Sequence, residues 1–267
     1  MKLRLPDIPN VSGDPLDMLC RADELGLLLA PGDDSPDKFL TRLTALRAEI
    51  DCGLPADAAE LSPGIREAAE RIVFDLYGIR PSWIPACFSS RETDHFSAGV
   101  TLILNETVPV VFLSGAFRKK ARHRGYDAAE TLAHEMVHAV RICFPPDSVY
   151  DEYFPCQVHK SRFRRAAGNF FRKWYIPLLF FGGLTFAVLH PAFLLLPPAV
   201  LLRELQLSAR IRSAAAKLRE LGLRPEPVLL RLSDGEIESL ARGRVPACLS
   251  DGGSLRRDLF FRRFRAR

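Results

Sequence analysis

The sequence predicts an α+β fold: helices around a small β-sheet, then a hydrophobic membrane segment and a helical C-terminal region. Two short β-rich runs, 100–104 and 108–113, are separated by a polar triplet and are typical of a hairpin. Apolar residues at helical spacing follow Asp127 up to a pair of prolines, which indicates a buried helix. The run 174–202 contains no Asp, Glu, Lys or Arg, which favours a bilayer environment.

Composition places the chain among globular proteins with a mildly basic character. Its 267 residues are enough for one sizeable core with appendages, and its net charge is +5. Basic residues are concentrated in 160–173, 203–219 and 256–267, so we expect the C-terminal half to meet an anionic surface, either lipid headgroups or nucleic acid. Six scattered cysteines without a C-x-x-C pair argue against a disulfide framework. No signal-peptide pattern is recognised, so the soluble part is expected to face the cytoplasm.

Four regions are expected along the chain. They are an irregular N-terminal segment (1–34), the α+β domain (35–165), the membrane segment (174–202) and a helical basic region (203–267). Within the α+β domain, one helix is predicted over 35–50 from the spacing of its apolar residues. A second is predicted from Ser62-Pro63 to Leu76, with its end at Gly78. Asn105-Glu106-Thr107 fits a glycosylation acceptor but is interpreted as the hairpin turn.

The membrane segment leaves two arrangements open. It is long for one span, yet two spans would need about 40 residues. Its prolines and glycines would break a helix in water but are tolerated in a bilayer. Basic residues flank both ends, so the positive-inside rule gives no orientation. We expect either a re-entrant hairpin broken near His190-Pro191, with both ends cytoplasmic, or a single tilted helix. His190 itself is either functional or a helix-break residue near the headgroups.

The C-terminal region is predicted to be largely helical. Strong helix formers run from Glu204 to Leu221, and Ser233 to Glu236 matches a capping box. The tail, 255–267, interleaves Phe with Arg. It is either a disordered basic end or an anchor on the membrane surface.

The strongest chemical signal is His134-Glu135-Met136-Val137-His138, an H-E-x-x-H motif. Residues i and i+4 lie on one helix face, so both imidazoles can reach one metal ion. Zinc accepts neutral imidazole and leaves one position for water in catalytic sites. Glu135, beside the first ligand, is placed to take a proton from that water. We therefore predict a zinc site with Glu135 as the general base.

A third protein ligand is expected beyond the helix. Glu152 is preferred, with Asp151 as the runner-up and His159 third. If Glu152 starts a helix, Asp151 points about 100° away, so only one of the two binds the metal. A group that stabilises the oxyanion is also needed. Tyr153 is preferred for its proximity to Glu152, and the other candidates are Tyr150, His159, Arg141 and His95.

The motif and its downstream acid resemble the gluzincin group of zinc metallopeptidases, over residues 127–153. The resemblance implies a zincin-like metalloprotease domain that cleaves protein or peptide substrates, with His134, His138 and Glu152 as zinc ligands and Glu135 as catalytic base. The membrane segment is similar to that of integral-membrane members such as the CAAX-prenyl-protease type. The gluzincin resemblance also implies a β-strand edge beside the active helix that aligns the peptide substrate, and residues 108–113 are predicted to form it.

Two features mark departures from related groups. The gap from His138 to Glu152 is shorter than in thermolysin-like members, so the third ligand stands at a different spacing from the one that those members use. Metzincin character is excluded because Arg141 and Phe144 stand where that motif needs Gly and His.

Two other classes of function remain as alternatives. One is a catalytically inactive membrane adaptor, in which the motif is coincidental or holds a structural metal. The other is a basic nucleic-acid-binding protein that uses 203–219 and the tail. The apolar run argues against the latter, so lipids and a peptide substrate are the expected partners and nucleic acid is not.

Overall fold

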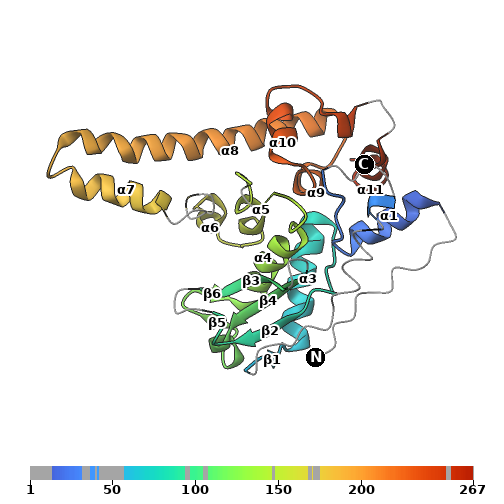
Figure 1. The fold of residues 1–267 in the computed structure, drawn as a ribbon, viewed down its shortest axis with the longest axis horizontal. Coiled ribbons are helices and arrows are strands. Elements are labelled where there is room, and N and C mark those ends of the chain that lie inside the picture. The colour runs from blue at the N-terminus through green and yellow to red at the C-terminus, as the bar shows by residue number, and fades with distance from the viewer. Residues whose placement is uncertain are drawn as a thin grey trace.

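The computed structural model describes residues 14–31, 37–39, 41, 57–93, 97–104, 108–145, 148–167, 170, 175–250 and 254–266. The fold is mixed α+β, as predicted (Figure 1). Helix α4 (Ala128–Val140) packs on strands β3 (Gly99–Leu104) and β4 (Val108–Ser114), and α3 (Pro63–Tyr77) packs on α4. This layer of sheet and two helices holds the H-E-x-x-H motif at its centre.

The main sheet has four strands in the order β1-β2-β4-β3, with β1 at Ala59–Glu60 and β2 at Ala86–Ser89. The predicted hairpin is confirmed, because β3 and β4 pair antiparallel from Gly99↔Leu113 to Leu104↔Val108. Its turn, 105–107, lies outside the described residues. Strand β4 is buried between β2 and β3, whereas β3 is an edge strand. A short ribbon of β5 (Arg122–His123) and β6 (Tyr126–Asp127) leads directly into α4.

The two central helices begin and end where local signals predict. Helix α3 ends before Gly78, which adopts φ 68° and so takes a left-handed conformation that glycine tolerates. Asp127 caps α4 by accepting the N–H groups of Ala129 and Glu130. The helix predicted over 35–50 lies mostly outside the described residues, although Phe39 is fully buried.

The N-terminal segment is not irregular throughout, in contrast to the sequence prediction. Helix α1 (Pro15–Glu24) buries Met18, Leu19 and Ala22 in the main core. Its Asp23 carboxylate forms a two-point ion pair with Arg231, which follows helix α9 (Pro225–Leu230). The local pattern is short and interrupted by Pro and Gly, so the contacts that stabilise this helix come from distant parts of the chain.

Both interpretations of the C-terminal tail were wrong. Residues Leu255–Arg263 form helix α11, which packs on α1. Leu259, Phe260 and Phe264 are buried, and Arg262 pairs with Asp14 and Asp17 of the N-terminal helix. The Phe residues recur at helical spacing and therefore face the core. Arg262 and Arg263 meet acids on or beside α1. Arg256 pairs with Glu236 of α10 (Asp234–Ala241).

The C-terminal region shares its core with the α+β domain rather than standing apart. Helix α8 (Leu196–Glu220) includes the predicted stretch from Glu204 and packs on α9 and α10 (Asp234–Ala241). The capping box at Ser233 and Glu236 is confirmed. The single-turn η4 (Ala247–Leu249) contacts α11. Residues of α8 to α11 join the same continuous cluster of buried side chains as α3 and α4.

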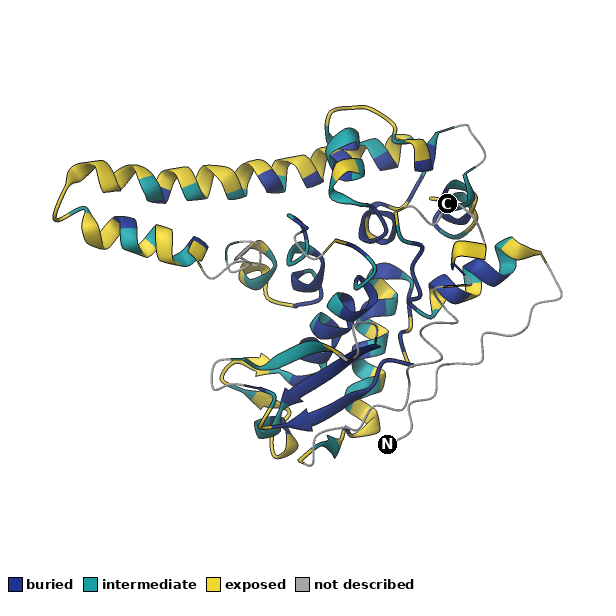
Figure 2. Cartoon of the chain, in the orientation of Figure 1, coloured by how far each residue is buried: buried dark blue, intermediate teal, exposed yellow. Residues whose placement is uncertain are grey.

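The apolar run forms a helical hairpin that projects from the body (Figure 1). Helix α7 (Tyr175–Phe186) is followed by the 3-10 helix η3 (Pro191–Leu195), which leads into α8. The predicted break near His190 is confirmed, and the single tilted helix was wrong for this segment. Most of the hairpin is exposed, as Figure 2 shows. By length and composition alone, Pro191–Glu220 is the one helix among the described residues able to cross a membrane.

Candidate metal centre

Helix α4 presents the two histidines of the motif to the same side. His134 and His138 are one turn apart, and their ring centroids are separated by 5.0 Å. The opposite surface of α4 is fixed by burial of Leu132, Met136 and Val140 in the core. The two imidazoles are therefore held by the packing of the whole helix, which limits their movement relative to each other.

Glu152 lies opposite the two histidines, at the start of the short helix α5 (Tyr153–Cys156), which is followed by α6 (Arg162–Ala167). Its Oε1 is 3.3 Å from His138 Nε2, and its Oε2 is 3.6 Å from His134 Nε2. One ligand atom from each of the three residues lies within 4.8 Å of the others. Tetrahedral zinc with bonds of about 2.1 Å holds its ligand atoms about 3.4 Å apart. The spacing and the donor set, two imidazoles and one carboxylate, thus fit zinc.

Asp151 lies on the other side of the His138 ring. Its Oδ2 is 3.7 Å from His138 Nδ1, while His138 Nε2 faces Glu152. The two acids preferred for the third ligand thus approach different nitrogens of the same ring. In metal sites, a carboxylate that accepts a hydrogen bond from the far nitrogen of a ligating histidine orients the ring, and Asp151 lies on that side of His138. The third candidate, His159, instead pairs its Nδ1 with Glu130 at 3.2 Å and stacks its ring 5.4 Å from that of His134.

The two histidines differ strongly in their affinity for protons. Burial and the neighbouring His138 lower the pKa of His134 to about 3, so its ring is neutral. Burial alone would lower the pKa of His138, but the adjacent Glu152, Glu135 and Asp151 carboxylates raise it to about 9. In the metal-free site a proton on His138 therefore balances the surrounding negative charge.

Glu135 lies beside the histidines and is 8% exposed. Its Oε2 accepts a hydrogen bond of 2.8 Å from the Thr101 hydroxyl on β3. Burial raises the pKa of Glu135, and the contacts with His138 and Thr101 offset part of that increase. Sequence reasoning missed Thr101, because nothing local distinguishes it from any other strand threonine.

A cavity of about 530 Å³ opens onto these groups. It is lined by α4, by the segment that carries Asp151 and Glu152, and by Gly99 to Ile103 of β3. The strand beside the motif is thus the edge strand β3. The prediction that residues 108–113 form the strand edge beside the active helix was wrong. That segment forms β4, which has a neighbouring strand on each side.

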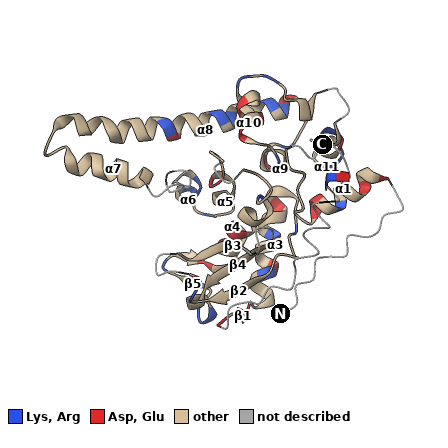
Figure 3. Ribbon diagram, viewed as in Figure 1, with Lys and Arg blue, Asp and Glu red and all other residues tan. Residues whose placement is uncertain are grey.

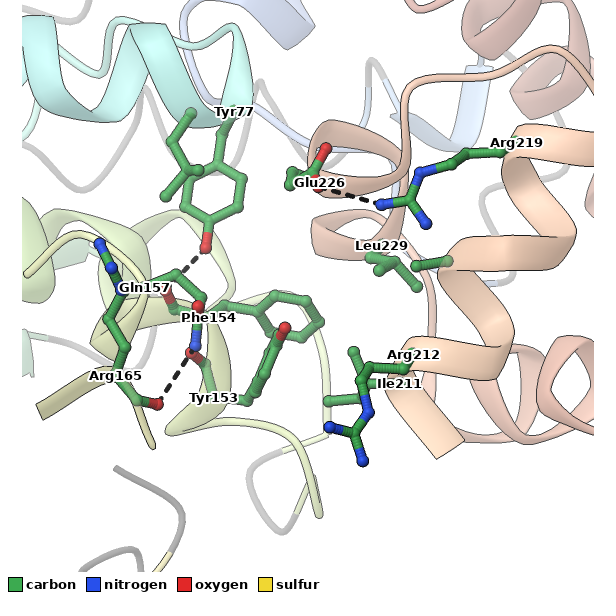
Figure 4. Close-up of a pocket in the computed structure, with 12 residues that line it drawn as sticks. Tyr77, Tyr153, Phe154, Gln157, Arg165, Ile211, Arg212, Arg219, Glu226 and Leu229 are labelled. Carbon is green, nitrogen blue, oxygen red and sulfur yellow. Dashed lines mark hydrogen bonds and ion pairs between the residues drawn. The ribbon is translucent and has the colours of Figure 1, made fainter. Parts of the chain in front are cut away.

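Tyr153 does not line this cavity. It faces a second cavity of about 560 Å³, between α3 and α5 on one side and α8 and α9 on the other (Figure 4). Figure 4 shows Tyr153 and Phe154 across from Ile211 and Arg212. The predicted role of Tyr153 in stabilising an oxyanion at the metal is therefore not supported. A residue next to Glu152 in sequence points to another side of the chain once α5 has formed.

The other proposed oxyanion donors differ in their positions. Tyr150 donates to Glu238, at 2.9 Å, and is thus engaged elsewhere. Arg141 lines the cavity; its Nη1 donates to the Leu230 carbonyl, whereas its buried Nε and Nη2 have no hydrogen-bond partner among the described residues. His95 lies outside the described residues.

Comparison with known proteins supplies no relative for this arrangement. No family model, curated protein or solved structure matches the chain. The chemistry of the site is therefore the basis for a functional proposal.

Proposed function

We propose that the chain is a membrane-attached zinc metallopeptidase in which His134, His138 and Glu152 hold zinc and Glu135 is the general base. The observation that carries this proposal is the meeting of three ligand atoms within 4.8 Å at the cavity that Glu135 also lines. The resemblance of the motif to gluzincins agrees with it. When bound, zinc polarises a substrate carbonyl and lowers the pKa of water, so that hydrolysis proceeds at neutral pH.

Glu135 is suited to carry the proton. A base works best when its pKa is close to the working pH, and burial moves the pKa of Glu135 in that direction. Its carboxylate takes the proton from the attacking water and then donates it to the leaving amine. Thr101 holds Oε2 of that carboxylate, which leaves Oε1 as the atom for this transfer.

The edge strand β3 supports a peptide as substrate. An extended peptide can add to a free strand edge through main-chain hydrogen bonds. Among the described residues β3 pairs with β4 alone, and its residues Gly99, Val100, Thr101 and Ile103 line the cavity. A substrate laid along β3 would pass its scissile bond between the three ligands and Glu135.

The exposed apolar hairpin supports attachment to a membrane. Fourteen large apolar side chains between Tyr175 and Leu205 are exposed, far more than a soluble surface normally carries in one place. Lipids would cover them. We place the catalytic domain on the cytoplasmic face, in keeping with the absence of disulfides among the five cysteines that the structure describes.

Metal content and proteolysis measured on the same samples test this proposal. The full chain in detergent is compared with Glu135→Gln, His138→Ala and the matched control Glu60→Gln, an exposed acid on β1. We expect one zinc per chain in all except His138→Ala, and cleavage of an unfolded protein substrate only in the unchanged chain and Glu60→Gln. Zinc retained without any cleavage would favour the inactive adaptor. Folded protein that takes up no zinc would overturn the metal site.

A further inference from the structure

We infer that the hairpin formed by α7, η3 and the start of α8 enters only one leaflet of the bilayer, so that residues 175 and 202 emerge on the same face. This inference rests on the membrane attachment in the proposed function and adds its geometry. It begins from how the two arms of the hairpin pack.

The two arms form one preassembled unit. A Cβ on Gly183 of α7 would lie 2.8 Å from Pro197 Cδ and 2.9 Å from Leu196 Cβ, so glycine permits the arms to touch. Near the tip, the rings of Phe186 and Phe193 are 5.9 Å apart. The arms therefore enter a lipid phase together, with their backbone hydrogen bonds already made.

The depth of this unit fits half a bilayer. The 12 residues of α7 give an arm of about 18 Å. The returning arm, 191–202, is about 20 Å long when its 3-10 turn is included. The hydrocarbon core of a bilayer is about 30 Å thick, so one leaflet offers about 15 Å. Arms of this length exceed one leaflet by only a few ångströms, so a modest tilt brings the tip to the middle of the bilayer, and the tip falls short of the far side.

Charge appears where the hairpin would leave the hydrocarbon. Figure 3 shows the ribbon of both arms without charged residues until partway along α8, where the first blue and red segments stand next to each other at Arg203 and Glu204. Arg203 directly follows the apolar run, and Arg210 lies two turns further on. On the other arm, α6 carries Arg162, Arg164 and Arg165. Basic side chains at both ends of the hairpin fit the anionic headgroups of one membrane face.

The alternative crossing geometries agree less well with the structure. A hairpin that spans the bilayer twice needs about 20 residues in each arm. If α8 crossed alone, Arg203 and Glu204 would lie within the hydrocarbon, and the exposed apolar side of α7 would remain in water. Charged side chains at that depth are costly.

Depth-dependent quenching of an added tryptophan tests the position of the tip. Leu189→Trp at the tip, Leu202→Trp at the base and Val245→Trp on the exposed body are prepared in full-length Glu135→Gln and mixed with anionic phospholipid vesicles. Compared with the parent chain, we expect the added signal of Leu189→Trp to be quenched most by lipids brominated near the ends of the acyl chains. That of Leu202→Trp should be quenched most by lipids brominated near the headgroups, and Val245→Trp by neither. Quenching of Leu189→Trp by iodide trapped inside the vesicles would show that the tip crosses, and would overturn the inference.

A charge at the tip gives an independent readout. Val188 is 90% exposed, so Val188→Arg leaves the protein fold intact. At the middle of the bilayer, the arginine should weaken partition into vesicles by about a hundredfold, while Val245→Arg changes it little. Unchanged partition of Val188→Arg would mean that the tip lies in water, which contradicts one-leaflet insertion.

The outcomes separate this inference from the peptidase chemistry. Failure of the parent chain to bind vesicles, or a soluble dimer that buries the hairpin, would overturn the inference together with membrane attachment. Zinc content and cleavage in detergent would still stand. If the quenching profile is as expected but the protein binds no zinc or cleaves no substrate, only the peptidase chemistry is overturned.

Discussion

At the scale of single residues, the site is organised by the position of His138 between two acids. Asp151 approaches its Nδ1 and Glu152 its Nε2. The resulting pKa of about 9 contrasts with about 3 for His134, although the two rings lie one helical turn apart. A metal bound at Nε2 must replace the proton that this ring carries at neutral pH.

Zinc binding should therefore release close to one proton per ion from His138 near neutral pH, in addition to the proton that a zinc-bound water gives up as it ionises. As the pH falls below the pKa of about 9, the apparent zinc affinity should weaken about tenfold per pH unit, because proton and metal compete for one ring. Calorimetric titration in buffers of different ionisation enthalpy measures the protons released. His134 contributes none, since it is already neutral. An affinity that stays constant from weakly acid to neutral pH would contradict the assignment.

At the scale of elements, the close approach of β3 to α4 determines how the general base is held. A Cβ on Gly99 would lie 2.9 Å from Thr131 Cγ2 and 3.0 Å from Glu135 Cγ, so only glycine fits at this contact without displacement. The strand can then bring the Thr101 hydroxyl within 2.8 Å of the Glu135 carboxylate.

Replacing Thr101 with Val should lower kcat/KM by about tenfold or more, because a hydrogen bond to a charged group is lost. That bond favours the ionised carboxylate, so its removal raises the pKa of Glu135 further. The acid limb of the pH–rate profile should consequently move to higher pH, at unchanged zinc content. Thr101→Ser keeps the hydroxyl and serves as the matched control. The same profile for Val and Ser would rule out this role.

At the scale of the whole molecule, helix α1 near the N-terminus is held by ion pairs to the C-terminal helices. Arg231 is 1% exposed and holds both oxygens of Asp23, at 2.6 and 2.8 Å. Arg263 of α11 contacts the same carboxylate. Helices α1, α9 and α11 are thereby joined through one buried acid, next to the core that supports α4.

Asp23→Ala should destabilise the protein by about 3–5 kcal/mol, because it leaves the Arg231 guanidinium buried without a counter-charge. The matched control is Arg262→Ala, whose ion pairs with Asp14 and Asp17 are exposed and should contribute less than about 1 kcal/mol. Denaturant unfolding in detergent measures both. Equal losses for the two variants would mean that the chain ends do not share the cooperative core.

Features set by neighbouring residues were predictable from the sequence. The caps at Asp127 and Ser233, the end of α3 at Gly78, the β3–β4 hairpin and the break near His190 all depend on a few adjacent side chains. The shared direction of His134 and His138 follows likewise from helical geometry. Two histidines and a glutamate in five residues thus indicated metal chemistry before any packing was known.

Tertiary structure decided what depends on segments distant in sequence. The packing of α5 on α4 determines that Glu152, and not Asp151, approaches both histidines. The same packing directs Tyr153 into another cavity. The partners of β3 and α11 are far away in sequence, so neither the free strand edge nor the burial of the tail was visible in local patterns. Sequence spacing determines the face of a helix on which a side chain lies. Only the packing of distant elements determines what that face meets, because burial and pairing are properties of the assembled core.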